Sequence, residues 1–142
     1  MVFYEFDYES FPNVKIIFNG KVNNDDLEEM FKEWLSIYKR KTDFNIIFDI
    51  TKVRSPTVYF AYKMANFINI LRRQTPQYFK KSFVIAPNSK ILRCLLKITF
   101  SISKPVSQVY IYWKNKNEQV NVNNILHIFN TNMFKFNYVS NK

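Results

Sequence analysis

The stretch "NIIFDITKVRSPTVYF", residues 45–60, contains the change of pattern on which the fold of this chain depends. It begins within a short apolar run that has turn residues on both sides, which is typical of a strand buried on both faces of a parallel sheet. A polar loop after Asp49 leads to Ser55 and Pro56, and serine and proline are favoured where a helix begins. The stretch therefore predicts a central strand, a loop, and a helix that runs to about Gln74.

The same alternation of strand and helix patterns extends to both sides. The other strand patterns lie at residues 2–9, 14–20, 81–87 and 107–113. The other helix patterns lie at residues 23–41, 88–103 and 120–129. Asn24 or Asp25 is positioned to cap the first of these helices, and the tail 131–142 alternates as one more edge strand would.

This order predicts an α/β fold with a mixed, largely parallel central sheet of about five strands flanked by about four helices. We expect a single domain over residues 1–142, with its core in residues 2–130. The N-terminus has no signal-peptide pattern, and no apolar run is long enough to span a membrane. The single cysteine, Cys94, excludes an intrachain disulfide, so we expect an intracellular, cytoplasmic protein.

Composition excludes several kinds of site. A glycine-rich phosphate loop is absent because Gly20 is the only glycine. One cysteine and one histidine, His127, cannot build a zinc site without several carboxylates. Nothing in the sequence pairs Cys94 with His127 as nucleophile and base. We therefore expect no enzyme activity, no cofactor and no metal.

Charge is distributed unevenly along the chain. Residues 1–49 hold ten of the eleven acids, whereas residues 50–142 hold one acid, Glu118, and 15 of the 21 bases. The net charge of +10 favours an anionic partner, which could be an acidic protein, an anionic membrane or nucleic acid. The alternative is a solvated basic surface without a dedicated partner.

The segment "NIIFDITKVRSPTVYFAYKMANFINILRR", residues 45–73, resembles the STAS domains, the SpoIIAA-like anti-sigma-factor antagonists. In that family a central strand ends in an aspartate, as "IIFDIT" does with Asp49, and a hydroxyl at the next helix start is phosphorylated by a partner kinase. The Asp-Ser-Ser-Gly type motif of the family is absent, and only Ser55 and Thr57 remain near that position. This resemblance implies a protein-binding regulatory module without the usual phospho-switch.

A second resemblance covers the segment "FINILRRQTPQYFKKSFVIAPNSKILRCLLKITFSISKP", residues 67–105. It is similar to the later part of the CRAL-TRIO lipid-binding domain, where a helix, an aromatic-containing turn, a strand, a helix and a proline-containing loop follow one another. This resemblance implies a binder of lipid or of an anionic membrane surface.

Two groups of residues are the candidate binding sites. Asp49 could be a site carboxylate at the sheet edge or a cap of its own loop, and Ser55 could be a phosphate site or a helix cap. The partner-binding or regulatory loop consists of Asp49, Thr51, Lys52, Arg54, Ser55, Thr57 and Tyr59. The basic face consists of Lys90, Arg93 and Lys97. This face suits a membrane or phosphates if it is not simply solvated, and nucleic acid is a weaker third partner because no motif supports it.

Overall fold

The computed structural model describes residues 2–141 as one sheet with helices on both of its faces. The strands are β1 (Tyr4–Asp7), β2 (Asn13–Lys21), β3 (Phe44–Arg54), β4 (Phe79–Pro87), β5 (Gln108–Lys114) and β6 (Phe136–Val139). The helices are α1 (Asn24–Ile37), α2 (Val58–Arg72), α3 (Lys90–Ile102) and α4 (Ile125–Thr131), with 3-10 turns η1 (Tyr38–Arg40), η2 (Val122–Asn124) and η3 (Met133–Lys135). The predicted α/β fold with a mixed sheet and four helices is confirmed.

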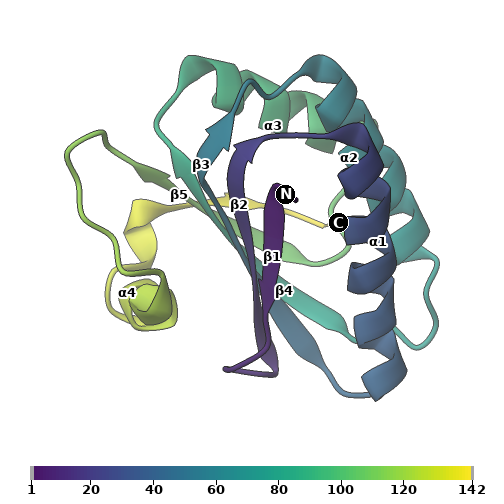
Figure 1. Cartoon of the computed structure of the whole chain (residues 1–142). Helices are drawn as coiled ribbons and strands as arrows, with labels where there is room; N and C mark the ends of the chain where they lie inside the picture. Colours follow the sequence, from purple (N-terminus) through teal and green to yellow (C-terminus); the bar gives the residue numbers. More distant parts are fainter. Residues whose placement is uncertain (1, 142) are drawn as a thin grey trace.

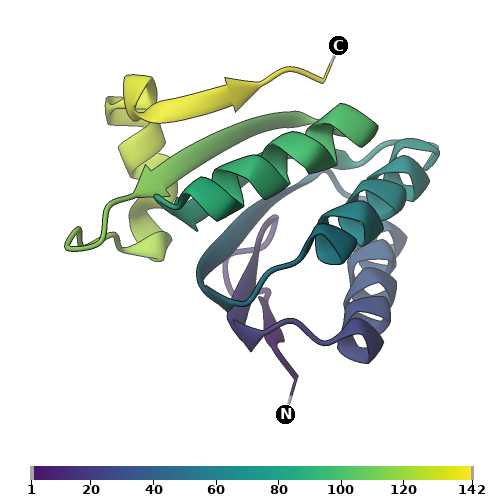
Figure 2. The ribbon, with the colours of Figure 1, turned by 90° about the horizontal axis from the view of Figure 1, so that it is seen from above.

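The six strands lie in the sheet in the order in which they occur in the chain. The four central strands, β2 to β5, are parallel, while β1 and β6 pair antiparallel with their neighbours at the two edges. Each parallel connection carries one helix, and α1, α2 and α3 cover one face of the sheet (Figures 1 and 2). The short helix α4 lies on the opposite face.

Alternation along β3 supplies apolar side chains to a core on each face. Ile46 and Phe48 pack in the larger core under α1–α3, whereas Ile47 belongs to a second core on the α4 face. The second core also contains Phe83, Ile85, Tyr112, Ile125 and Phe136. The central strand is therefore buried on both faces, although its polar residues Asn45 and Asp49 are only half-buried.

The start of α2 differs from the prediction. Thr57, and not Ser55, caps the helix by accepting a hydrogen bond from the Phe60 N–H at 3.1 Å. Ser55 instead has a φ of 50°, which turns the chain out of the strand before Pro56. The reason is that β3 continues to Arg54, so the turn occupies the two residues predicted to begin the helix.

Two smaller predictions also need correction. The supposed polar loop 51–54 is strand, because Lys52, Val53 and Arg54 pair with β2 beyond a β-bulge. Asn23, one residue before the predicted caps, caps α1 by accepting from the Asp25 N–H. Of the helices that the structure describes within residues 2–141, none has the length and apolarity that a membrane crossing requires.

Candidate functional site

A cavity of about 90 Å³ lies between the sheet and the helices α2 and α3. Helix α2 contributes Phe60, Met64 and Ile68 to its wall, and α3 contributes Leu92, Leu96 and Phe100. The sheet supplies apolar residues of β3, β4 and β5 as its floor. None of the lining side chains is charged, so the cavity suits an apolar group.

Two polar atoms in the cavity wall lack a hydrogen-bond partner. The indole N–H of Trp34 and the hydroxyl of Ser107 are both buried and unpaired, in residues that are 6% and 3% exposed. Buried polar groups are normally satisfied, because leaving one unpaired costs about 1–3 kcal/mol. Trp34 and Ser107 therefore each carry a hydrogen-bonding group that the surrounding protein leaves unsatisfied.

Trp34 and Ser107 lie toward the same end of the cavity. The Trp34 ring packs 5.7 Å from that of Phe79, the first residue of β4. Ser107 directly precedes β5, whose first residue Gln108 pairs with Lys81, two positions after Phe79. The unpaired donors thus lie near the amino ends of the parallel strands.

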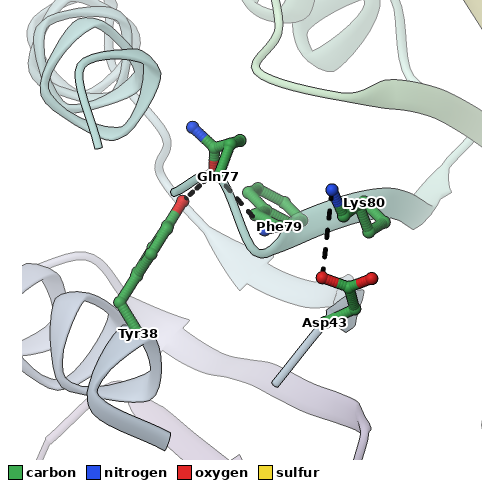
Figure 3. A network of polar contacts seen from close by, with 5 residues as sticks. All are labelled: Tyr38, Asp43, Gln77, Phe79 and Lys80. Carbon is green, nitrogen blue, oxygen red and sulfur yellow. Dashed lines mark hydrogen bonds and ion pairs between the residues drawn. The ribbon is translucent and has the colours of Figure 1, made fainter. Parts of the chain in front are cut away.

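A hydrogen-bond network around Gln77 lies next to Phe79, which lines this end of the cavity (Figure 3). The Tyr38 hydroxyl donates to Gln77 Oε1 over 2.5 Å, and the same oxygen accepts from the Phe79 N–H at 3.3 Å. Gln77 Nε2 donates to the Leu71 carbonyl at 2.8 Å, which ties the end of α2 to the start of β4. Burial raises the pKa of Tyr38, so its hydroxyl remains a donor. The exposed pair of Lys80 and Asp43 lies beside this network at 3.9 Å.

Two hydroxyl groups, one within α3 and one directly after it, hold α3 against α2 beside the cavity. Ser103 Oγ donates to the Ala65 carbonyl at 2.8 Å, and Thr99 Oγ1 lies 3.5 Å from the Ala61 carbonyl. The small side chains of Ala61 and Ala65 allow this close approach. At the end of α2, Arg72 Nη1 donates to the carbonyls of Lys104 and Pro105 at 3.2 and 2.9 Å. We call this line of contact between α2 and α3 the seam.

The cavity in this conformation is much smaller than most ligand sites, which measure about 300–1,000 Å³. It has room for a small apolar group but not for a complete lipid.

The predicted regulatory loop does not form one cluster. Asp49 lies within β3 on the face away from α2, where its Oδ1 accepts from the Thr51 N–H at 3.0 Å and the Thr51 hydroxyl at 2.7 Å. Arg54 lies five positions further along the strand, at a distance of about 16 Å. Lys52, Arg54 and Tyr59 are exposed around the turn between β3 and α2.

The predicted basic face is divided. Lys90 and Lys97 are exposed on α3, but the Arg93 guanidinium lies 4.3 Å from the centre of the Trp113 ring. Arg93 also donates from Nε and Nη2 to Asn88 Oδ1 at 3.1 and 2.9 Å. Arg93 is therefore held against the end of β5, whereas the two lysines project into solvent.

A second hollow of about 350 Å³ lies near the carboxyl end of β5, between Trp113, Asn115 and Lys135. Its acid, Glu118, already accepts a hydrogen bond from the Tyr112 hydroxyl and another from the Asn115 N–H at 3.1 Å. Burial and this bond raise the pKa of Tyr112 to about 12. No three histidine, cysteine or acidic side chains within residues 2–141 come together as a metal site.

Cys94 and His127 do not meet. Cys94 is exposed on α3, whereas His127 is exposed on α4 across the sheet. This separation is the direct result of placing α3 and α4 on opposite faces.

Comparison with known families relates this geometry to a class of protein. The model of a divergent CRAL/TRIO domain matches residues 6–141, which is nearly the whole chain. The chain belongs to the CRAL/TRIO family. No curated protein and no solved structure matches it. Of the two sequence resemblances, this match supports the one to CRAL-TRIO domains. It gives no support to the resemblance to STAS domains.

The residues around the cavity of this CRAL/TRIO domain were not among the predicted sites. Trp34 and Phe60 look like ordinary members of apolar helix faces in the sequence. The one visible signal is Ser82, a polar residue within the apolar run of β4, which lines the cavity floor.

Proposed function

We propose that this CRAL/TRIO domain binds a lipid whose apolar part enters the cavity between α2, α3 and the sheet. The observation that carries the proposal is an uncharged, apolar cavity whose wall has two unpaired polar atoms, on Trp34 and Ser107. The family match adds independent support, because CRAL/TRIO domains form a lipid-binding family.

The absence of charge from the wall limits what can be buried there. An ionised headgroup without a partner of opposite charge would cost several kcal/mol to bury, whereas a chain with a neutral oxygen would not. The hydroxyl, carbonyl or ester oxygen of a lipid could accept from the Trp34 N–H and pair with the Ser107 hydroxyl. A charged headgroup would then stay outside, at the seam.

We further propose that the domain binds without catalysing a reaction. The position of Cys94 and His127 on opposite faces of the sheet supports this proposal, since a nucleophile and its base must be within hydrogen-bond reach.

A fluorescent polyene fatty acid tests the lipid site. In a Trp113→Phe variant, Trp34 is the only tryptophan, and energy transfer from it to the probe reports occupation of the cavity. Replacing Ser107 with Leu in that background fills part of the cavity, and we expect probe affinity to fall at least about tenfold.

Ser101→Leu is the matched control, because Ser101 is exposed on α3. We expect it to leave probe affinity unchanged. Thermal unfolding checks that Ser107→Leu still folds, as we expect, because leucine replaces an unpaired buried hydroxyl. Equal affinities of the Ser107→Leu and Ser101→Leu variants would show that the cavity is not the binding site.

A further inference from the structure

Exposed apolar side chains gather on the outer surface of α2 and α3. Within residues 2–141, six of the ten exposed large apolar residues lie on these two helices. We call them the outer patch: Val58, Tyr59, Tyr62 and Ile70 of α2, and Ile91 and Ile102 of α3. Tyr62 and Ile91 are 50% and 63% exposed, although other residues of the same helices are buried in the core.

The outer patch extends over both helices beside the seam. Ala61 faces Thr99 and Ala65 faces Ser103 across the seam, so α2 and α3 lie side by side (Figure 2). Tyr62 follows Ala61 and Ile102 precedes Ser103, and both are exposed. The patch therefore lies on the outer, solvent-exposed side of the two helices, with Tyr62 and Ile102 beside the seam.

The charged residues that α2, α3 and their adjoining segments contribute around the outer patch are all basic. No acid occurs between residues 50 and 117, so α2, α3 and the segments that join them carry only bases. Lys52 and Arg54 precede α2, Arg73 follows it, and Lys90 and Lys97 are exposed on α3. Most of the acids lie on α1 and β1, and the one that reaches α2 is Glu28 of α1, which pairs with Lys63 at 2.6 Å.

We propose that the outer patch docks on an anionic lipid membrane. Exposed aliphatic and tyrosine side chains beside lysine and arginine, on helices that contain no acid, match the interfacial region of such a membrane. The apolar residues can enter the headgroup region while the bases contact anionic lipids. This surface is separate from the cavity, so the proposal does not depend on lipid binding inside it.

Vesicle sedimentation with the full chain tests the docking. We expect the wild-type chain to bind vesicles of phosphatidylcholine and phosphatidylserine at least about tenfold more strongly than vesicles of phosphatidylcholine alone, with binding that falls as salt rises. Tyr62→Ser combined with Ile91→Ser, and Lys90→Glu combined with Lys97→Glu, should each lower the affinity for the mixed vesicles about tenfold or more.

Two matched controls use equally exposed residues elsewhere. Met133→Ser with Phe134→Ser removes apolar side chains on η3, which are 58% and 82% exposed. Lys39→Glu with Lys41→Glu reverses two exposed charges after α1. Neither pair should change binding to the mixed vesicles by more than about twofold.

Two results would overturn the proposal. The first is that the wild-type chain fails to sediment with the mixed vesicles, or that patch and control variants sediment alike. The second is that sedimentation velocity shows a dimer that the Tyr62 and Ile91 changes dissociate, which would make the patch a contact between two copies. Binding of the polyene fatty acid by the patch variants distinguishes a failure of docking from a failure of the cavity site.

Discussion

Ser55 and Thr57 show how a single residue can satisfy a sequence rule without having the expected role. Ser55-Pro56 fits the pattern of a helix start, but Thr57 makes the capping hydrogen bond and Ser55 takes a positive φ. The sequence contains two hydroxyl residues that suit a cap, and only the length of β3 decides between them. Local preference alone could not make that choice.

Thr57→Ala should lower the free energy of unfolding by about 1 kcal/mol, because the Phe60 N–H loses its partner at the helix start. Ser55→Gly should keep or slightly raise it, because glycine adopts a positive φ without steric cost. Urea unfolding of both variants measures these changes. A larger loss for Ser55→Gly than for Thr57→Ala would contradict the assignment of Thr57 as the cap.

Trp34 and Ser107 show the limit of prediction at this scale. Each is an ordinary residue in its own element, and their lack of hydrogen-bond partners results from packing between α1, α3 and the sheet. Such a combination has no signature in spacing or composition, so the candidate cavity could not be predicted from the sequence. Exposed residues such as Lys90 and Lys97 could be predicted, because charge alone indicates exposure.

At the scale of the elements, sequence patterns locate most strands and helices but not their ends. Alternation in "TKVR" after Ile50 is itself a strand pattern, with Lys52 and Arg54 exposed and Thr51 and Val53 half-buried. Those four residues extend β3 because β2 supplies partners as far as Lys21. Pairing between distant segments therefore sets the end of the strand, and the local sequence does not show it.

The seam between α2 and α3 gives a prediction for a pair of elements. Ser103→Ala removes the hydrogen bond to the Ala65 carbonyl, and we expect a loss of about 1 kcal/mol in the free energy of unfolding. Looser helices should also let the polyene fatty acid enter and leave the cavity faster, which stopped-flow fluorescence can measure.

The control for this change is Ser101→Ala, two residues earlier on the exposed side of α3. It should alter neither the free energy of unfolding nor the entry rate. Unchanged entry rates in Ser103→Ala would show that the seam does not limit access to the cavity.

At the scale of the whole molecule, the sheet separates two cores with different neighbours. The face under α1–α3 contains the cavity, and the α4 face contains a smaller cluster centred on Ile47, Phe83 and Ile125. Lys15 of β2 is buried beside this cluster and donates to Asn123 of η2, which links the first half of the chain to its last part. A substitution in the core on the α4 face should therefore lower stability without changing lipid binding in the cavity on the other face.

Ile125→Ala tests this separation. Ile125 is fully buried among residues of the second core, so we expect a loss of about 2–5 kcal/mol in the free energy of unfolding. Under conditions where the variant is folded, its affinity for the polyene fatty acid should equal that of the wild type. A lower affinity in folded protein would mean that the two faces are coupled.

The order of strands and helices could be predicted, but it did not decide between the two families. Both resemblances rest on strand–helix alternation around residues 45–105, and that alternation does not specify what the helices enclose. The family match over residues 6–141 covers nearly the whole chain, including the last strand and the segment that covers the second face.

The sequential order of the six strands has a consequence for how the chain is made. Each new strand pairs with the one synthesised just before it, so the sheet can grow as the nascent chain leaves the ribosome. Until β6 is complete, however, β5 has an unpaired edge with the apolar residues Val109 and Ile111. Synthesis of β6 therefore ends the exposure of this β5 edge to other nascent chains.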